Sequence, residues 1–533
     1  MGILEDINIA IEHTKKGKFD LAECIYLKHK DNETVLPFLG WLYLTQKRYQ
    51  EAINTFEKIQ NKEPHNVCTG LGLAYYHLEQ FQYAYPFLKK SADISPTLDI
   101  LDKLLNCACE NTNQVQTTFE YAKKMLNLYP DSTKSWSNYI LAALCAGKFQ
   151  IAEDFCNQQL AKNPETPSLY ISAGLIQEVL YSNFELAKEC YLKAYELNPS
   201  PAALYNIGLA YAKLNDYQNA EKYLLEAWKF SPEGKEINTS LYLLYAKQKN
   251  FQLAYKHFIK SSKNLLGQFH NSWDGNAYPN ETLYIFADQG LGDNIMYIRY
   301  LPFLKDYFKE IFIALPNNLI TLFKQCYTDK EFHFINHDEQ IEYDKSTILT
   351  LLPFLLKKYF SNIPFKDGYI TVPKETTQQE FNDKYLNIGL VWEAGGTKLR
   401  GSLDRSININ LFKDLFNIEN THFYSLQLNA TMKPNHPNIT DTSHLITEML
   451  DTAKIISHLD VVVTVDTSVA HLAGAMGKKT FLMLPYVRDW RWFDDKKQTS
   501  WYSNVELFVQ TNPLDWMSII SEISLKIKDL RKI

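Results

Sequence analysis

The sequence has few of the features that place a chain in a membrane or join it by disulfides. It contains no uncharged apolar run that approaches the roughly 18 residues needed to span a bilayer. The segment from Met1 to Asp6 lacks the basic and then apolar pattern of a secretion signal. Only eight of the 533 residues are cysteines, and their spacing relative to histidine does not predict a zinc site. We therefore expect a cytoplasmic chain with reduced thiols and no transmembrane segment.

An excess of positive charge is also missing. The formal net charge is -6 and the pI is near 6.1, so the chain has no basic field, and nucleic acid is not expected as a partner. Aromatic residues are abundant, with 34 Tyr and 30 Phe, and they suit packed helix pairs and ligand-stacking surfaces alike. A chain of 533 residues is too long for one hydrophobic core, so two or three domains are expected.

Prolines recur at a nearly constant spacing through the first half of the chain. Pro64, Pro96, Pro130, Pro164, Pro199 and Pro232 are 32, 34, 34, 35 and 33 residues apart. Alanines repeat with the same period, at Ala52, Ala84, Ala152, Ala187, Ala220 and Ala254. The clearest unit contains Gly208, Tyr211, Ala220, Leu224, Ala227 and Pro232, and related units contain Gly72 with Leu88 and Gly40 with Phe56. Such a period predicts stacked copies of one small structural unit.

Each unit is expected to form two antiparallel helices. Small residues at the glycine and alanine positions let the two helix axes approach closely, and the proline ends the second helix. One pair cannot bury its apolar face alone, so neighbouring pairs must stack. The pattern resembles the tetratricopeptide repeat over about residues 5–264. The resemblance implies an α-solenoid domain, residues 1–264, of about eight repeats.

The concave face of such an array is expected to bind an extended peptide or another protein. Asn138 and Asn206 occupy equivalent positions in their repeats, each two residues before the small-residue position. Side-chain amides there are candidates to bind a peptide backbone. The alternative is that both are ordinary solvated helix residues.

The helical period stops after about residue 264. A turn-rich linker, residues 265–280, precedes an apolar run at 282–287, a glycine turn and a helical stretch at 293–308. Further strands are predicted at 311–315, 332–335 and 347–352 and, after a connection at 376–385, at 386–392, 422–426 and 460–465. This alternation predicts two Rossmann-like α/β lobes, residues 281–375 and 386–533, with parallel sheets, a cleft between them and ligands at the carboxyl ends of the strands.

Two loops that follow predicted strands have the composition of ligand sites. In the first, Gly290 and Gly292 allow a tight turn, and Asp293 at the start of the next helix is either a helix cap or a catalytic group. The second, residues 393–406, carries three glycines and three cations, among them Lys398 and Arg405. Such a set suits a diphosphate, and the alternative is a solvated loop.

A third loop leads from the strand at 460–465 into a helix rich in small residues. Asp466, Thr467 and Ser468 begin this helix, and Thr467 shares one helix face with His471. Hydroxyls and free N–H groups at this end suit phosphate or sugar hydroxyls. For His471 the alternative is a buried structural histidine.

These loops resemble those of the bacterial heptosyltransferase-like glycosyltransferases, which have the GT-B architecture, and especially of the modules fused to tetratricopeptide repeats. The resemblance covers about residues 281–512. The matching segments are Gln289-Gly290-Leu291-Gly292-Asp293, Arg299-Tyr300-Leu301-Pro302, Val465 to Gly474, Leu484 to Trp492, and Ser500-Trp501-Tyr502.

The resemblance implies that Asp293 is the general base that removes the proton of the acceptor hydroxyl. The residues expected to bind the donor are Gly290, Gly292, Lys398, Arg405, Asp466, Thr467, Ser468, His471, Arg488 and Arg491. A nucleotide sugar is then the co-substrate, no further cofactor is implied, and direct displacement inverts the anomeric centre. No metal is expected, because Asp494-Asp495, the adjacent acidic pair near the site, is interpreted as a surface turn.

Three functions stay open at this point. The leading interpretation is a glycosyltransferase whose repeats recruit a protein or peptide acceptor. A second keeps the chemistry but makes the acceptor a glycan or a lipid-linked saccharide. A third is a non-catalytic scaffold in which the sugar-nucleotide module has decayed, although Asp293, Asp466 and His471 are all still present.

Overall fold

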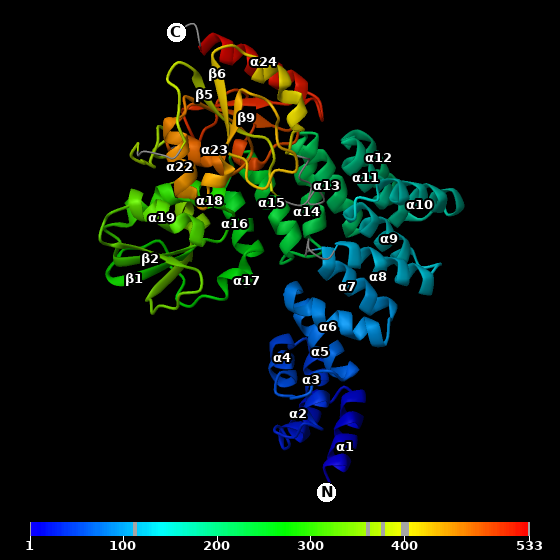
Figure 1. The fold of residues 1–533 in the computed structure, drawn as a ribbon. Coiled ribbons are helices and arrows are strands. Elements are labelled where there is room, and N and C mark those ends of the chain that lie inside the picture. Colours follow the sequence, from blue (N-terminus) through cyan, green and yellow to red (C-terminus); the bar gives the residue numbers. More distant parts are fainter. Residues whose placement is uncertain (1, 110–114, 359–362, 375–378, 396–404, 531–533) are drawn as a thin grey trace. The chain divides into compact units, whose positions relative to one another are not determined.

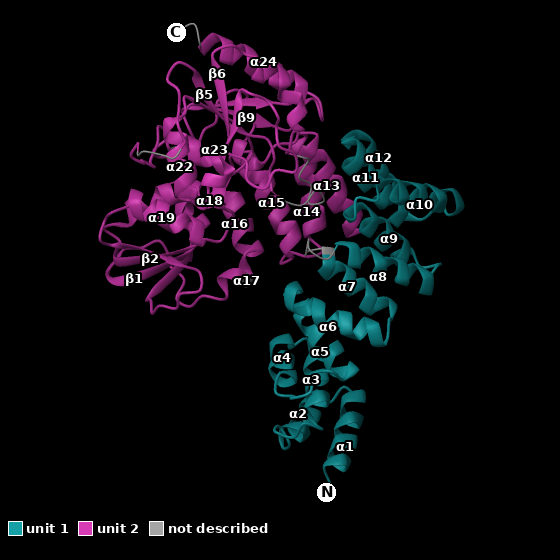
Figure 2. Ribbon diagram, in the orientation of Figure 1, with its two compact units in different colours: residues 1–199 teal, residues 200–533 magenta. Residues whose placement is uncertain are grey.

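The computed structural model describes residues 2–109, 115–358, 363–374, 379–395 and 405–530. The chain divides into two compact units, Met1–Pro199 and Ser200–Ile533 (Figure 2). The candidate donor-binding residue Lys398 is not among the described residues.

The first unit consists of helices arranged as successive antiparallel pairs, coloured blue to cyan in Figure 1. The helices are α1 (Ile3–Lys15), α2 (Phe19–Leu27), α3 (Leu36–Thr45), α4 (Tyr49–Phe56), α5 (His65–His77), α6 (Phe81–Ile94), α7 (Leu98–Cys109), α8 (Val115–Leu128), α9 (Thr133–Cys145), α10 (Phe149–Lys162), α11 (Pro167–Tyr181) and α12 (Phe184–Leu197). The glycine positions of the repeat are where the two helices of a pair meet. A Cβ on Gly40 would lie 2.6 Å from the ring of Phe56, and one on Gly72 would lie 2.9 Å from Leu88.

The same pairing continues into the second unit. Its helices are α13 (Pro201–Lys213), α14 (Tyr217–Trp228), α15 (Lys235–Lys247), α16 (Phe251–Ser261) and the short α17 (Lys263–Leu266). A Cβ on Gly208 would lie 2.6 Å from Leu224, as the repeat pattern predicts. The border between compact units, at Pro199, thus falls inside the predicted repeat domain 1–264, because α13 to α16 group with the sheets that follow.

A four-stranded parallel sheet follows the helices. Its strand order is β3-β2-β1-β4, with β1 at Tyr278–Phe286, β2 at Phe308–Leu315, β3 at Phe332–Asn336 and β4 at Lys345–Ile348. Helix α18 (Leu291–Tyr297) follows β1, α19 (Asn317–Cys326) follows β2, and α20 (Leu352–Leu355) comes after β4. The predicted strands are present, but β1 starts inside the predicted linker 265–280, and β4 ends at Ile348.

The helical stretch predicted at 293–308 is shorter than expected. Helix α18 gives way to a 3-10 helix, Ile298–Leu304, which contains Pro302. Proline has no N–H to donate and clashes with the carbonyl four residues earlier, so a regular α-helix does not continue through it.

The second sheet has six parallel strands in the order β10-β9-β8-β5-β6-β7. The strands are β5 (Leu386–Val391), β6 (Thr421–Ser425), β7 (Ile439–Asp441), β8 (Val461–Val465), β9 (Thr480–Leu484) and β10 (Val505–Val509). The helices are α21 (Lys413–Phe416), α22 (Met449–His458), α23 (Ser468–Ala475) and α24 (Trp516–Leu530). When β5 is counted as strand 1, the order reads 6-5-4-1-2-3, which is the strand order of a doubly wound nucleotide-binding sheet. The sequence predicted β5, β6 and β8 but not the other three strands.

None of the helices in the described part of the chain is both long enough and apolar enough to cross a membrane. Residues at the centre of each sheet are fully buried, such as Leu283 in β1 and Val463 in β8. This burial on both faces is typical of parallel sheets. The polar residues of interest therefore gather where the strands end.

Candidate functional site

Each sheet carries a polar contact at the point where its strand order reverses. In the first sheet this point lies between β1 and β4, and the hydroxyl of Thr350 donates to Asp288 at 2.8 Å. In the second sheet it lies between β5 and β8, and Arg405 donates to the backbone oxygen of Asp466 at 3.1 Å. Ligands of doubly wound sheets bind at such points, beyond the carboxyl ends of the strands.

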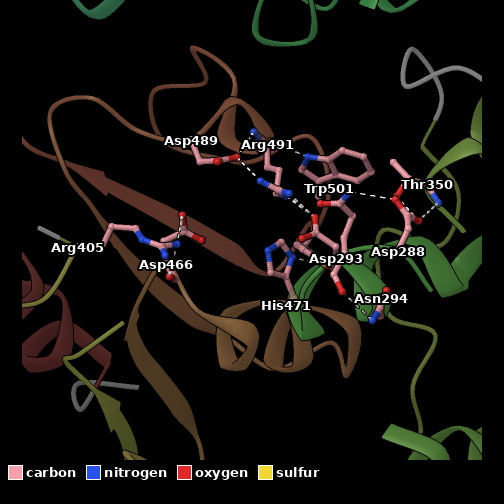
Figure 3. Close-up of polar contacts among 12 residues, drawn as sticks. Asp288, Asp293, Asn294, Thr350, Arg405, Asp466, His471, Asp489, Arg491 and Trp501 are labelled. Atoms are coloured by element: carbon pink, nitrogen blue, oxygen red, sulfur yellow. Dashed lines mark hydrogen bonds and ion pairs between the residues drawn. The ribbon is translucent and has the colours of Figure 1, made fainter. Parts of the chain in front are cut away.

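An ion pair joins the two lobes between these points (Figure 3). Arg491, in a 3-10 helix after β9, donates from Nε to Oδ1 of Asp293 at 2.5 Å, and its Nη2 lies 2.5 Å from the same oxygen. Asp293 is in the first turn of α18. The two side chains are 13% and 19% exposed, so the pair is largely shielded from water.

Arg491 also binds a second carboxylate. Its Nη1 donates to Oδ1 of Asp489 at 2.7 Å, and its backbone N–H donates to the same oxygen at 3.0 Å. Burial lowers the pKa of the guanidinium, but Asp293 and Asp489 outweigh burial, so this pKa lies well above its usual value. Burial raises the pKa of Asp489, but Arg491 outweighs it and holds this pKa below its usual value.

Asp293 has the environment of a carboxylate that can take up a proton. Burial raises its pKa, and Asp489 and Asp288 raise it further, whereas Arg491 lowers it without cancelling the effect of burial. Among the described residues, no side chain or backbone group donates a hydrogen bond to its second oxygen, Oδ2. A raised carboxylate pKa in a pocket is the property expected of a general base.

Asp293 lines a pocket of about 230 Å³ in the second unit. Its other lining residues are Lys235, Thr239, Tyr242, Leu243, Phe258, Ser261, Ser262, Gln289, Tyr297, Thr350, Trp490 and Arg491. The walls thus come from α15 and α16, from the first lobe and from the second lobe.

Gly292 and His471 lie in direct contact where α18 meets α23. A Cβ on Gly292 would be 2.7 Å from Cδ2 of His471, so only glycine fits there. Nδ1 of His471 lies 3.0 Å from the hydroxyl of Tyr502. The imidazole ring stacks on Trp492, with 5.0 Å between the ring centroids. Burial, together with the charges of Arg491 and Arg299, lowers the pKa of His471 to about 3. The histidine is therefore buried and packed where the two lobes meet, and its part in donor binding stays a prediction.

The loop after β8 places Asp466 at the edge of the site. Asp466 is 5% exposed, and burial and Asp489 raise its pKa, which Arg405 and Arg491 offset only in part. Thr467 is the N-cap residue of α23, and Thr467 and Ser468 are both half-buried. The first N–H groups of a helix are natural ligands of phosphate. Gly290, at the N-cap of α18, has open space where a Cβ would point, apart from Asp293 Oδ2 at 3.8 Å.

The three arginines predicted to bind the donor differ in their hydrogen-bond and ion-pair partners. The Arg405 side chain is 31% exposed and also donates to the backbone oxygen of Gly395 at 3.1 Å. Arg488 donates to the carbonyl of Phe493 at 2.7 Å and lies 3.6 Å from Asp494, so it holds its own segment together. Arg491 is bound to two carboxylates, as described above. Of these three side chains, that of Arg405 is the most exposed to solvent.

Arg299 belongs to one of the segments that match the family, but the sequence predicted no role for it. Its side chain is completely buried. It donates to the carbonyls of Pro364 at 3.2 Å and Trp501 at 3.0 Å, and to the hydroxyl of Tyr369 at 3.1 Å. Its guanidinium lies 4.8 Å from the ring of Tyr502. An arginine of the first lobe thus satisfies its donors on Trp501 of the second lobe and on residues of its own lobe, including the segment after α20.

The two candidate peptide ligands already use their amides. Nδ2 of Asn138 donates to Asp102 at 2.9 Å, and Nδ2 of Asn206 donates to the carbonyl of Ala202 at 2.9 Å. Both are half-buried helix residues. Their part in peptide binding stays a prediction.

Asp494 and Asp495 also have partners. Asp494 accepts from Tyr217 at 2.8 Å, and Asp495 accepts from Lys249 at 2.9 Å. In the part of the chain that the structure describes, no group of three or more His, Cys, Asp or Glu is placed to hold a metal ion.

Comparison with protein families identifies the helix pairs. Tetratricopeptide repeat models match residues 39–66 and 182–234. The chain carries tetratricopeptide repeats. The two matches fall on helices of both compact units, and they do not extend to the sheets.

Curated relatives and solved structures with similar chains are distant. The chain is 20% identical over 227 residues to anaphase-promoting complex subunit 3 of Schizosaccharomyces pombe, covering 42% of this chain and 34% of that protein. It is 22% identical over 244 residues to the BBSome complex member BBS4 of Bos taurus, covering 45% and 46%. The chain thus spans less than half the length of both relatives.

Among solved structures, a tetratricopeptide repeat protein from Parabacteroides merdae is 14% identical with a TM-score of 0.39, covering 48% of this chain and 98% of that one. The type IV pilus biogenesis factor PilW is 18% identical with a TM-score of 0.30, covering 39% and 98%.

Proposed function

We propose that the chain is an inverting glycosyltransferase of GT-B architecture that transfers a sugar from a nucleotide-sugar donor to a hydroxyl of a protein or peptide acceptor. The observation that carries this proposal is the position of Asp293. It is a shielded carboxylate of the first lobe with a raised pKa, and one of its oxygens has no hydrogen-bond donor in the part of the chain that the structure describes. It lines a pocket beside a cation of the second lobe.

In the proposed reaction Asp293 accepts the proton of the acceptor hydroxyl while the hydroxyl oxygen bonds to the anomeric carbon of the donor. The bond between that carbon and the phosphate oxygen breaks at the same time, and the nucleoside diphosphate leaves with its electron pair. A single displacement of this kind inverts the anomeric centre. A positioned base typically contributes about 100- to 10,000-fold to the rate.

The second lobe binds the donor in this proposal. The diphosphate lies at the β5–β8 reversal point, where the N-terminus of α23 and Arg405 neutralise the charge that develops on the leaving group. Asp466 accepts hydrogen bonds from donor hydroxyls. Gly290, at the start of α18, leaves room beside Asp293 for the sugar.

The proposal is tested by comparing the wild-type chain with an Asp293→Asn variant. Both are incubated with UDP-, GDP-, ADP- and CMP-sugars, and release of the nucleotide is measured. We expect release with at least one donor and a loss of about 100-fold or more in the variant. Asp306→Asn is the matched control, because Asp306 is exposed on the same lobe. Release that is equal in Asp293→Asn and wild type contradicts the role of the base, and no release with any donor favours the scaffold interpretation.

A saccharide acceptor is the second candidate function. Tyr242 and Trp490 line the same pocket and their rings lie 5.6 Å apart, and aromatic rings of this kind also pack against sugars. Transfer to an oligosaccharide and to no peptide would favour this candidate.

A further inference from the structure

The last helix pair, α15 and α16, is fixed to both lobes within the second unit. On the first lobe, the hydroxyl of Tyr255 donates to the carbonyl of Thr350 at 3.2 Å, and its ring stacks on Phe354 at 5.1 Å. On the second lobe, Lys249 binds Asp495 at 2.9 Å, and Phe251 contacts the ring of Phe493 at 6.0 Å. The pair is therefore held in place beside the site by contacts on two sides.

This pair supplies one wall of the pocket that contains Asp293. Its contribution is rich in hydroxyl groups, with Thr239 and Tyr242 from α15, Ser261 from the end of α16, and Ser262 immediately after it. The hydroxyls of Thr239 and Ser261 donate to carbonyls of their own helices, at 2.9 Å each, and their oxygens can still accept a hydrogen bond. Polar groups that line a pocket together with a carboxylate are the pattern by which a site orients a polar substrate group.

Tyr242 is the most informative residue of this wall. Its ring lies against Phe258 at 4.9 Å and Trp490 at 5.6 Å, which fixes its direction. Tyr242, Asp293 and Arg491 all line this pocket, so the tyrosine and the ion pair share one cavity. No hydrogen-bond partner of this hydroxyl occurs among the described residues.

The size of the pocket limits its occupant. At about 230 Å³ it is smaller than the roughly 300–1,000 Å³ of sites that enclose a whole small-molecule ligand. It can hold a group of side-chain size and not a complete nucleotide sugar. One wall is the helix pair α15 and α16, which follows the tetratricopeptide repeats matched at residues 182–234 and continues their helix pairing, and stacked pairs of this kind present extended binding surfaces.

We propose that this pocket is the acceptor subsite, that it receives the hydroxyl-bearing side chain of a serine or threonine in a polypeptide, and that Tyr242 and Thr239 of the last repeat orient that side chain toward Asp293. This inference rests on the proposed glycosyl transfer. The repeats are then part of the active site as well as a means of recruitment. Tyr242 donates a hydrogen bond to the acceptor, and Asp293 Oδ2 accepts the hydroxyl proton.

The test compares full-length wild type with Tyr242→Phe and Thr239→Val. The acceptors are a library of synthetic peptides that each carry one serine or threonine, and, in a second arm, a panel of mono- and disaccharides. Each variant is assayed for transfer and for donor hydrolysis, in which water is the acceptor. Tyr223→Phe is the matched control, because Tyr223 lies on α14 and stacks on Tyr211 away from the pocket.

We expect transfer to peptides, and a ratio of transfer to hydrolysis that falls about 10-fold or more in Tyr242→Phe and Thr239→Val, with no change in Tyr223→Phe. A ratio that stays constant in both variants overturns the inference, because the residues then do not contact the acceptor. Transfer to saccharides and to no peptide overturns the polypeptide occupant.

The outcomes separate this inference from the function on which it rests. A wild type that neither transfers nor hydrolyses any donor contradicts the proposed glycosyl transfer itself. The Tyr242→Phe variant keeps the ring that packs on Trp490, and a thermal unfolding curve shows whether each variant is folded.

Discussion

Arg491 binds a single oxygen of Asp293 with two of its nitrogens, Nε and Nη2, each at 2.5 Å. Both donors of one edge of the guanidinium therefore converge on Oδ1, and Oδ2 has no donor among the described residues. The contact fixes the orientation of the carboxylate, which lines the pocket.

This pairing predicts the pH dependence of the reaction. Arg491 lowers the pKa of Asp293 against the raising effects of burial, Asp489 and Asp288. In Arg491→Gln the lowering effect is lost, the pKa rises, and the acid limb of the plot of kcat/KM against pH moves to higher pH. Arg491→Lys keeps the charge but not the two-nitrogen contact, so we expect a smaller shift. An acid limb that does not move in Arg491→Gln contradicts this assignment.

His471 predicts a fall in stability at acid pH. An unfolded histidine has a pKa near 6.5, whereas burial lowers that of folded His471 to about 3. Between these values the unfolded chain binds a proton that the folded chain does not, so stability falls as the pH drops from about 6.5 toward 3. The pH dependence of the unfolding temperature should be weaker in His471→Gln than in wild type. His444→Gln, at an exposed position of the same lobe, should match wild type.

Gly292→Ala should destabilise the second unit. The new Cβ would lie 2.7 Å from His471, and the lobes must separate or the ring must move, at a cost of about 1–3 kcal/mol. Gly395→Ala is the control, since nothing lies within 4 Å of a Cβ there. Urea unfolding of both variants measures the difference, and equal midpoints would show that α18 and α23 are not tightly packed.

Arg299→Met should also destabilise the fold. The substitution leaves the buried carbonyl of Trp501, the part-buried carbonyl of Pro364 and the hydroxyl of Tyr369 without their arginine donor. Each unsatisfied buried group costs about 1–3 kcal/mol, so a loss on the order of 3 kcal/mol is expected. Thermal unfolding measures it. Arg299→Lys should recover part of the loss, because lysine keeps a charged donor, and full stability in Arg299→Met would contradict the role of these contacts.

Transfer should persist in EDTA. The carboxylates of Asp494 and Asp495 are occupied by Tyr217 and Lys249, and the proposal assigns the charge of the leaving diphosphate to Arg405 and α23. Nucleotide release measured before and after chelation checks this expectation. A loss of activity that Mg²⁺ or Mn²⁺ restores would show that a metal takes this part.

The repeat half of the fold could be predicted from the sequence because its signal is local and recurs. Gly208 and Leu224 lie in one unit, and the structure places them in contact at the position that the pattern assigns to close helix approach. The alternation of apolar runs likewise predicted both parallel sheets. Strands β9 and β10 were not predicted, although Thr480–Leu484 is a buried apolar run.

The contacts of the candidate site could be predicted only in part. Asp293 was identified from its place at a helix start after a glycine turn, but its partner Arg491 lies 198 residues away. Such a pairing depends on how two separate sheets pack. The wall formed by Tyr242 was not predicted either, because the repeat pattern treats its position as one among many on a helix face. Three other residues of the site lie in positions that the sequence marks. Asp288 precedes the glycine turn, Thr350 follows β4, and Asp489 lies in the segment Leu484 to Trp492 that carries the family resemblance.

The border at Pro199 determines which truncated forms of the protein keep the pocket. A fragment cut at the end of the repeat pattern, near residue 264, would discard Lys235, Thr239, Tyr242 and Ser261 together with the rest of that pocket wall. A fragment that begins at Ser200 retains every lining residue. The smallest fragment in which to look for activity is therefore one that keeps α13 to α16, two helix pairs that the repeat pattern of the sequence assigns to a separate domain.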